Sequence, residues 1–223
     1  MVVSVGLAGW VVAMMSLAYE TVKTFYVENR NTRIAVLGAP SVGKTTFLYQ
    51  LKYQVPVAPL QNKTERTSLL SQRIKVNYDD KSRHMKTKDV PGEGYLTGEW
   101  WRLLLELKPL GIIFLVDNRI VENDEQVNIF KTLISLLTSA SYMKMVKKKD
   151  RVKVMLIAVN KADLWQGDGM DVESMLDGIK DELVKLPDYG IAWNWASISA
   201  KYSEHIDYVI NWMVKSIESD MVI

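Results

Sequence analysis

The feature that most restricts how this chain can fold is the stretch LGAPSVGKTTF, residues 37–47, which contains the spacing G-x-x-x-x-G-K-T. Gly38 and Gly43 allow backbone angles and close approaches that a side chain would obstruct. The loop can turn its N–H groups inward, and the helix that follows adds its positive N-terminal end. A loop of this kind lies between a buried strand and a helix and cradles phosphates, so the motif predicts an α/β fold around a phosphate site.

The residues of this loop have different expected parts in the site. Lys44 can reach the β- and γ-phosphates of a nucleotide, and the Thr45 hydroxyl can ligate Mg²⁺. Pro40 has no N–H group, so the cradle must rely on residues 41–45. The expected phosphate-binding residues are Gly38, Ala39, Pro40, Ser41, Val42, Gly43, Lys44, Thr45 and Thr46. The same spacing serves ATPases, GTPases and transport motors, so it does not identify the base.

From Arg33 onward, strand patterns alternate with helix patterns, which is typical of an α/β fold with a largely parallel sheet. We expect strands over 33–38, 71–78, 84–89, 111–117, 152–160 and 191–197, with a hairpin turn at 79–82. We expect helices over 44–53, 96–107, 123–141, 171–186 and 202–217, and a long loop over 54–70. Together they predict one domain, residues 33–223, built as a mostly parallel six-stranded sheet flanked by helices.

Composition excludes several other classes of site. The net charge of +2 gives no strong electrostatic case for nucleic acid as a partner. The chain has no cysteine, which excludes disulfides, thiolate zinc sites and cysteine nucleophiles. His84 and His205 are too far apart in the sequence to suggest a metal cluster, and each is expected to be a surface or packing residue.

The base is indicated by Asn160-Lys161-Ala162-Asp163, which follows an expected central strand. Guanine carries two adjacent donors that a carboxylate such as Asp163 can accept together, whereas adenine would leave that carboxylate unpaired. A buried unpaired charge costs several kcal/mol, so the motif favours GTP over ATP. The Lys161 stem can cover the base, and Asn160 can tie this loop to the phosphate loop. Ligands bind at this end of strands in such sheets.

A third segment, Ser199-Ala200-Lys201, follows the last expected strand, where its backbone N–H groups could meet the guanine O6. With DVPG at 89–92, these motifs stand in the order found in Ras-superfamily small GTPases, which residues 33–217 resemble. The stretch GIIFLVDN, residues 111–118, is most similar to the branch of Arf and the signal-recognition-particle receptor β-subunit. The resemblance implies the fold of a P-loop GTPase, or G domain, which binds GTP or GDP with Mg²⁺ and hydrolyses GTP.

The resemblance also implies residues that sense the γ-phosphate. Asp89 would hold Mg²⁺ through a water, and the Gly92 N–H would bind the γ-phosphate. A loop threonine would complete the Mg²⁺ shell; Thr67 is preferred by its spacing, and Thr64 is the alternative. Glu93 stands where family members often carry a glutamine that orients the attacking water. A glutamate accepts but does not donate, so we expect slow intrinsic hydrolysis, with Lys44, Gly92 and Glu93 as the catalytic residues.

Residues 2–19 are uncharged and apolar on all sides. An eighteen-residue helix is about 27 Å long, close to the roughly 30 Å hydrocarbon core of a bilayer. We therefore expect residues 1–20 to be a hydrophobic N-terminal helix that anchors the chain in a membrane, and 21–32 to be a juxtamembrane linker. The basic residues that follow favour a cytoplasmic domain. A helix packed on protein, a cleaved signal peptide and an interfacial anchor are the alternatives; the anchored branch of the family favours a span.

Two functions remain open. The first is a membrane-anchored switch that recruits an effector through residues 60–72 and 92–103, with a possible activating protein and exchange factor. The second is a receptor or scaffold subunit that keeps GTP as a structural cofactor and turns over little. Of Trp100 and Trp101, we expect one in the core and one as an anchor for a partner. The basic run at 144–151 is expected to be a solvated loop, with contact to anionic lipid as the alternative.

Overall fold

The computed structural model describes residues 32–53, 72–78, 81–87, 96–117, 124–164 and 178–220. The expected N-terminal helix and linker, residues 1–31, lie outside these ranges, so the structure does not test them. Within the described ranges, none of the helices combines the length and the apolar character that a membrane crossing requires.

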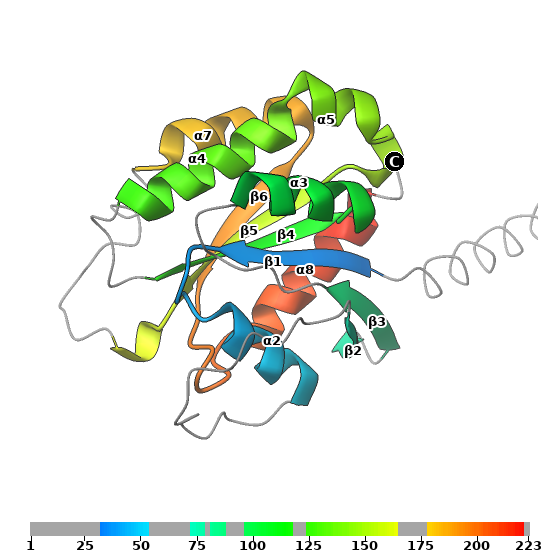
Figure 1. Ribbon diagram of the computed structural model, residues 1–223. Helices are drawn as coiled ribbons and strands as arrows, with labels where there is room; N and C mark the ends of the chain where they lie inside the picture. The colour runs from blue at the N-terminus through cyan, green and yellow to red at the C-terminus, as the bar shows by residue number, and fades with distance from the viewer. Residues whose placement is uncertain are drawn as a thin grey trace, which may run out of the picture. The chain divides into compact units, whose positions relative to one another are not determined.

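The centre of the fold is a block of four adjacent parallel strands: β1 (Thr32–Gly38), β4 (Gly111–Asp117), β5 (Val154–Asn160) and β6 (Ala192–Ser197). Beyond β1 the sheet continues with β3 (Lys81–Thr87) and β2 (Gln72–Tyr78), in the order β2-β3-β1-β4-β5-β6. Two registered residue pairs join β3 to β1 in parallel, and β2 is antiparallel to β3. The expected α/β class with a parallel sheet and flanking helices is therefore confirmed (Figure 1).

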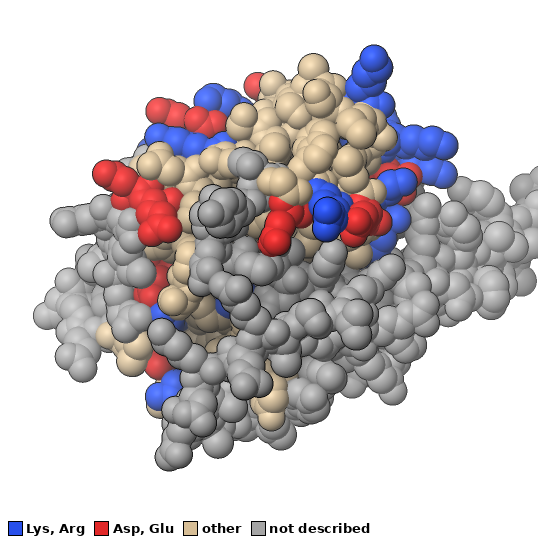
Figure 2. All heavy atoms as spheres, viewed as in Figure 1, with Lys and Arg blue, Asp and Glu red and all other residues tan. Residues whose placement is uncertain are grey.

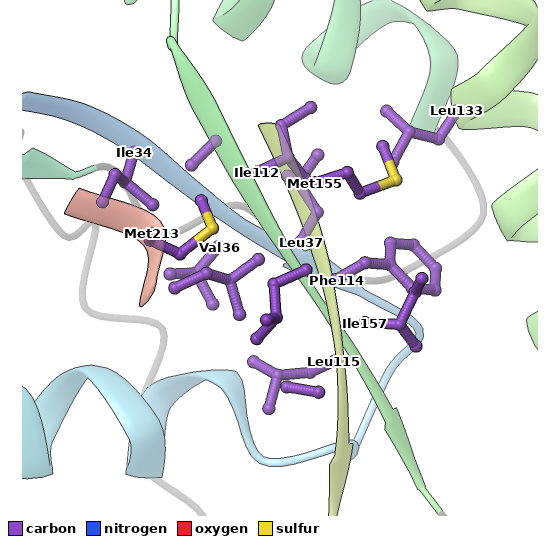
Figure 3. Close-up of a cluster of buried hydrophobic side chains, with 14 of the residues drawn as sticks. Ile34, Val36, Leu37, Ile112, Phe114, Leu115, Leu133, Met155, Ile157 and Met213 are labelled. Carbon is purple, nitrogen blue, oxygen red and sulfur yellow. The ribbon is translucent and has the colours of Figure 1, made fainter. Parts of the chain in front are cut away.

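Helices cover both faces of this block (Figure 1). One face carries α3 (Leu96–Glu106), α4 (Asp124–Thr138), α5 (Ala140–Met145) and α7 (Lys180–Lys185), and the other carries α2 (Lys44–Tyr53) and α8 (Ile206–Asp220). Because both faces are covered, β4 and β5 are buried along their whole length, which explains their continuous apolar sequences. Figure 3 shows this core, in which Met213 of α8 lies near Ile34 on one side of the sheet and Leu133 of α4 lies near Met155 on the other.

Trp100 is the large aromatic residue of this core. It is 1% exposed and meets Phe114 of β4 edge to face, with ring centroids 6.4 Å apart. Trp101 is half-buried and packs against the same core. The expectation that one of the two tryptophans belongs to the core is confirmed by Trp100.

Two helix boundaries differ from the expected ones. The helix expected over 123–141 ends at Thr138, because Ser139 is extended and its hydroxyl accepts from the Tyr142 N–H, which starts α5. The helix expected from 202 begins at Ile206, because Ser203 and His205 have positive φ angles of 64° and 58°, which a helix does not allow.

Three further differences are smaller. The run at 144–151 is not a plain loop, since α5 continues to Met145 and the 3₁₀-helix η1 covers Lys148–Asp150. In the hairpin, β3 begins at Lys81, so the strand takes up two of the residues expected in the turn. At the end of the helix expected over 171–186, α7 covers Lys180–Lys185 and a second 3₁₀-helix, η3, follows over Leu186–Tyr189.

Candidate functional site

The phosphate loop joins the carboxyl end of β1 to α2, which begins at Lys44. Gly38 and Gly43 have φ angles of +147° and +95°, and Ser41 also has a positive φ of 61°. A Cβ atom on Gly38 would lie 2.3 Å from the Leu115 carbonyl oxygen of β4. Glycine is therefore required there by both conformation and space, as the sequence motif predicts.

The Lys44 ammonium is held within the loop. The side chain is 8% exposed, and its Nζ donates to the carbonyl oxygens of Gly38 at 3.1 Å and Ala39 at 2.7 Å. The residue is also the first of α2, so a buried cation and the positive end of the helix lie at the same point. This arrangement fits a bound polyanion.

Asn160 connects three loops at the carboxyl edge of the sheet. Its side chain is buried, and Nδ2 donates to the Val42 carbonyl of the phosphate loop at 2.7 Å. Its Oδ1 accepts from the Ala200 N–H, beyond β6, at 2.9 Å. A Cβ atom on Gly43 would lie 2.4 Å from this Nδ2. The second glycine of the motif thus leaves room for the asparagine that fixes the loop.

Lys161 makes a second connection, which the sequence analysis did not predict. Its Nζ lies 2.5 Å from Oδ2 of Asp117, at the end of β4, and donates to the Ser41 carbonyl oxygen at 2.8 Å. Asp117 is fully buried, and its backbone N–H donates to the Gln126 side chain at 2.9 Å. The sequence signal that could have pointed to Asp117 is that it is the one charged residue of the run GIIFLVD and stands at its end.

Asp163 is fixed by the serine of the last motif. The Ser199 hydroxyl donates to Oδ1 of Asp163 at 2.6 Å, and this serine is itself buried. The hydroxyl had no expected role; it holds the carboxylate at the carboxyl edge while leaving acceptor capacity on the second oxygen. The Ser199 and Ala200 N–H groups, expected near a base carbonyl, donate to the Glu204 carbonyl and to Asn160.

The remaining residue of this motif, Lys201, lies at the rim. Its carbonyl oxygen accepts from Gln50 of α2 at 3.2 Å, which joins the loop to the helix of the phosphate site. Its ammonium lies 4.7 Å from the centre of the Tyr202 ring. Tyr202, and after it the charge of Asp163, raise the pKa of Lys201, so this side chain carries a positive charge beside the carboxylate.

Five expected site residues lie outside the described ranges: Thr64, Thr67, Asp89, Gly92 and Glu93. Residues 60–71 and 92–95 of the two expected partner segments also lie outside the described ranges, whereas residues 96–103 belong to α3, which covers Leu96–Glu106. In the part of the chain that the structure describes, three or more His, Cys, Asp or Glu side chains do not gather where they could hold a metal ion.

The groups that are described fit a guanine nucleotide. The phosphate loop supplies the buried Lys44 ammonium at the start of α2, and Asp163 supplies a fixed carboxylate on the neighbouring loop. Asn160 and Lys161 tie the two together through the Val42 and Ser41 carbonyls. Phosphates and base can therefore be held at one edge by parts that are already connected.

The comparison with protein families agrees with this geometry. The model of the family described as signal recognition particle receptor beta subunit matches residues 29–188, which is most of the chain. A search of curated proteins gives no match to the chain.

Proposed function

Since the chain belongs to the signal recognition particle receptor β-subunit family, a branch of the small GTPases, we propose that it is a membrane-anchored GTPase that acts as a switch. Membership in this family implies a GTP-binding domain. The proposal adds that GTP is bound with Mg²⁺, that it is hydrolysed slowly to GDP, and that the GTP-bound state recruits a partner protein.

The observation that carries the proposal is the hydrogen-bonded connection between the phosphate loop and the base-selecting loop. Asn160 and Lys161 reach Val42 and Ser41, and Ser199 holds Asp163. A site for phosphate alone would not require a fixed carboxylate on the next loop. Two adjacent donors, as on guanine, are what such a carboxylate accepts together.

Hydrolysis is assigned to the residues around the γ-phosphate. Lys44 would balance the charge that develops on the phosphate oxygens, and the Gly92 N–H would donate to them. Glu93 can accept a proton from the attacking water but cannot donate to the developing charge, which is why the rate is proposed to be low. Bound Mg²⁺ would neutralise phosphate charge, with Thr45, Thr67 and Asp89 as its proposed holders, directly or through water.

The membrane anchor is assigned to residues 2–19, with the domain on the cytoplasmic side. Its support is the uncharged apolar sequence together with the receptor family that the chain belongs to. Residues 60–72 and 92–103 are the proposed partner surface, because segments whose contacts depend on the γ-phosphate can signal which nucleotide is bound.

The first experiment identifies the base. The full-length protein is purified from membranes and its bound nucleotide is analysed by chromatography; we expect GTP or GDP. The variant Asp163→Asn replaces one acceptor by a donor, so it should lose guanine nucleotides and gain affinity for xanthine nucleotides, which carry a carbonyl at the same position. Tighter binding of ATP than of GTP by the native chain would refute the assignment.

The second experiment separates a switch from a scaffold. Multiple-turnover release of phosphate, stimulated by a partner, supports the switch, whereas co-purified GTP that does not exchange supports the scaffold. Glu93→Gln is the matched variant: it should raise the single-turnover rate, because glutamine can both accept from water and donate to the phosphate. An unchanged rate would exclude Glu93 as the cause of slow hydrolysis.

A further inference from the structure

Five exposed lysines gather at the amino edge of the sheet, opposite the nucleotide site. They are Lys108, Lys144, Lys147, Lys148 and Lys149, and we call them the basic edge. Figure 2 shows Lys and Arg side chains gathered on the right of the view, over the end of α5. The proposed function uses none of them.

Backbone contacts place this cluster beside the point where the chain enters the domain. The Leu110 N–H donates to the Arg33 carbonyl, and the Lys153 N–H donates to the Leu110 carbonyl, both at 2.8 Å. These bonds align the starts of β1, β4 and β5. The chain enters the domain at Thr32, the first residue of β1, so the entry point lies at this edge.

The segment that carries most of these lysines is well fixed. The buried Tyr142 accepts from the Val152 N–H through its hydroxyl oxygen at 3.1 Å. Arg151 donates through Nε to the Val146 carbonyl at 2.9 Å and through its guanidinium to the Met143 carbonyl. Arg151 thus bonds backbone carbonyl groups of its own domain, while the neighbouring lysines are exposed to solvent.

Two carboxylates near the basic edge have arginine partners. Asp150 pairs with Arg33 at 3.0 Å, and Glu106 lies 3.9 Å from Arg102. The hydrogen bond from Arg33 lowers the pKa of Asp150, and the charges of Lys149 and Lys108 lower it further. Lys149 and Lys108, which lie far apart in the sequence, therefore both lie close enough to Asp150 to act on its carboxylate.

We propose that the basic edge binds the anionic surface of a lipid bilayer. Lysine ammonium groups are compact point charges, suited to many phosphate and carboxylate headgroups rather than to one shaped ligand. Met145, 58% exposed, lies among these lysines and offers an apolar side chain to the headgroup region. The proposal rests in part on the membrane anchor of the proposed function, because the chain that would carry this anchor enters the domain at Thr32, on the same edge.

The experiment uses the absence of cysteine from the chain. Met145→Cys in the full chain is labelled with an environment-sensitive fluorophore and mixed with phosphatidylcholine vesicles that contain or lack phosphatidylserine. We expect a blue shift with phosphatidylserine only, and its loss at high salt. The matched control is Tyr208→Cys, which is similarly exposed at 52% but lies near the carboxyl edge, so it should not respond.

The charge requirement is tested by replacing Lys144, Lys147, Lys148 and Lys149 with Gln. Each replacement should weaken the response to phosphatidylserine about fivefold. All four lysines are exposed, so the urea midpoint should stay unchanged, which separates loss of binding from loss of folding. A blue shift that persists in the fourfold variant, or equal shifts with and without phosphatidylserine, would overturn the proposal, as would no shift at all.

Other measurements test the proposed anchor and the nucleotide site separately from the basic edge. Flotation of the full chain with neutral vesicles reports on residues 2–19, and GTP binding reports on the nucleotide site. Neither measurement depends on the basic edge. A chain that does not float with neutral vesicles but still shows the blue shift with phosphatidylserine would lose its anchor and keep this surface.

Discussion

Replacement of Lys161 by Met should destabilise the domain through Asp117 rather than through the nucleotide. Asp117 is fully buried, and Lys161 brings its ammonium within 2.5 Å of the carboxylate. Removing one partner of a buried ion pair costs about 3–5 kcal/mol. Because the Lys161 side chain retains 20% exposure to water, we expect the lower end, about 3 kcal/mol.

The reverse change should cost less. Asp117→Asn removes the buried charge, and Lys161 can then turn toward water, so we expect a loss of about 1 kcal/mol. In the double variant Lys161→Met with Asp117→Asn, no buried carboxylate is left without its cation. The double variant should therefore be more stable than the sum of the single changes predicts, by at least about 2 kcal/mol.

The assay is urea unfolding of the four proteins without added nucleotide, so that differences in ligand affinity do not enter. The native chain and the single variant Asp117→Asn serve as references for the other two. If the two single effects add to within about 0.5 kcal/mol, the pair is not coupled, and the inferred role of Lys161 in the free domain is wrong.

Three further changes test other parts of the structure. Gly43→Ala would place Cβ 2.4 Å from Asn160 Nδ2 and add backbone strain of about 1–3 kcal/mol. Nucleotide affinity, measured by titration, should therefore fall at least tenfold. Gly98→Ala, which has open space around it, is the control. The pKa of Asp150 is lower in the folded than in the unfolded state, so its ionised form stabilises the fold at neutral pH and this contribution is lost as the pH falls. Asp150→Asn removes the titrating group, so the urea midpoint should drop less between neutral and acid pH than in the native chain. A drop as large as that of the native chain would contradict this role of Asp150. Trp100→Ala should lower the free energy of unfolding by about 3–5 kcal/mol in the same assay. A loss below about 1 kcal/mol would show that neighbouring side chains move in to fill the cavity.

The sequence predicted best where local pattern and global fold agree. The strand expected over 111–117 is observed at those bounds, because a parallel strand covered on both faces must be apolar throughout. The helix expected over 44–53 also has the observed bounds, since it is fixed by the loop before it. Where one residue sets a helix boundary through its own side chain or backbone angle, periodicity carried no signal: Ser139 follows the end of α4, and Ser203 delays the start of α8.

In the candidate site, too, the sequence predicted some features and missed others. The motifs named Asn160, Lys161 and Asp163, and the predicted tie from Asn160 to the phosphate loop is confirmed by its bond to Val42. The partners of Lys161 and Asp163 were not predicted, since contacts between loops depend on the order of strands in the sheet. Asp117 was quoted only as part of the stretch GIIFLVDN and was given no role of its own, and Ser199 was noted for its backbone rather than its hydroxyl. Both are identified only when the ends of β4, β5 and β6 are placed side by side.

The parallel block has a consequence for how the two edges influence one another. Each of β1, β4 and β5 has seven residues, so about 23 Å of strand separates the lysines from the phosphate loop. The Debye length at physiological salt is about 8 Å, so exposed charges this far apart are largely screened. The proposed lipid contact and the proposed nucleotide site should therefore not influence each other through direct electrostatics. Any coupling between the two edges would have to come from displacement of the sheet and its helices.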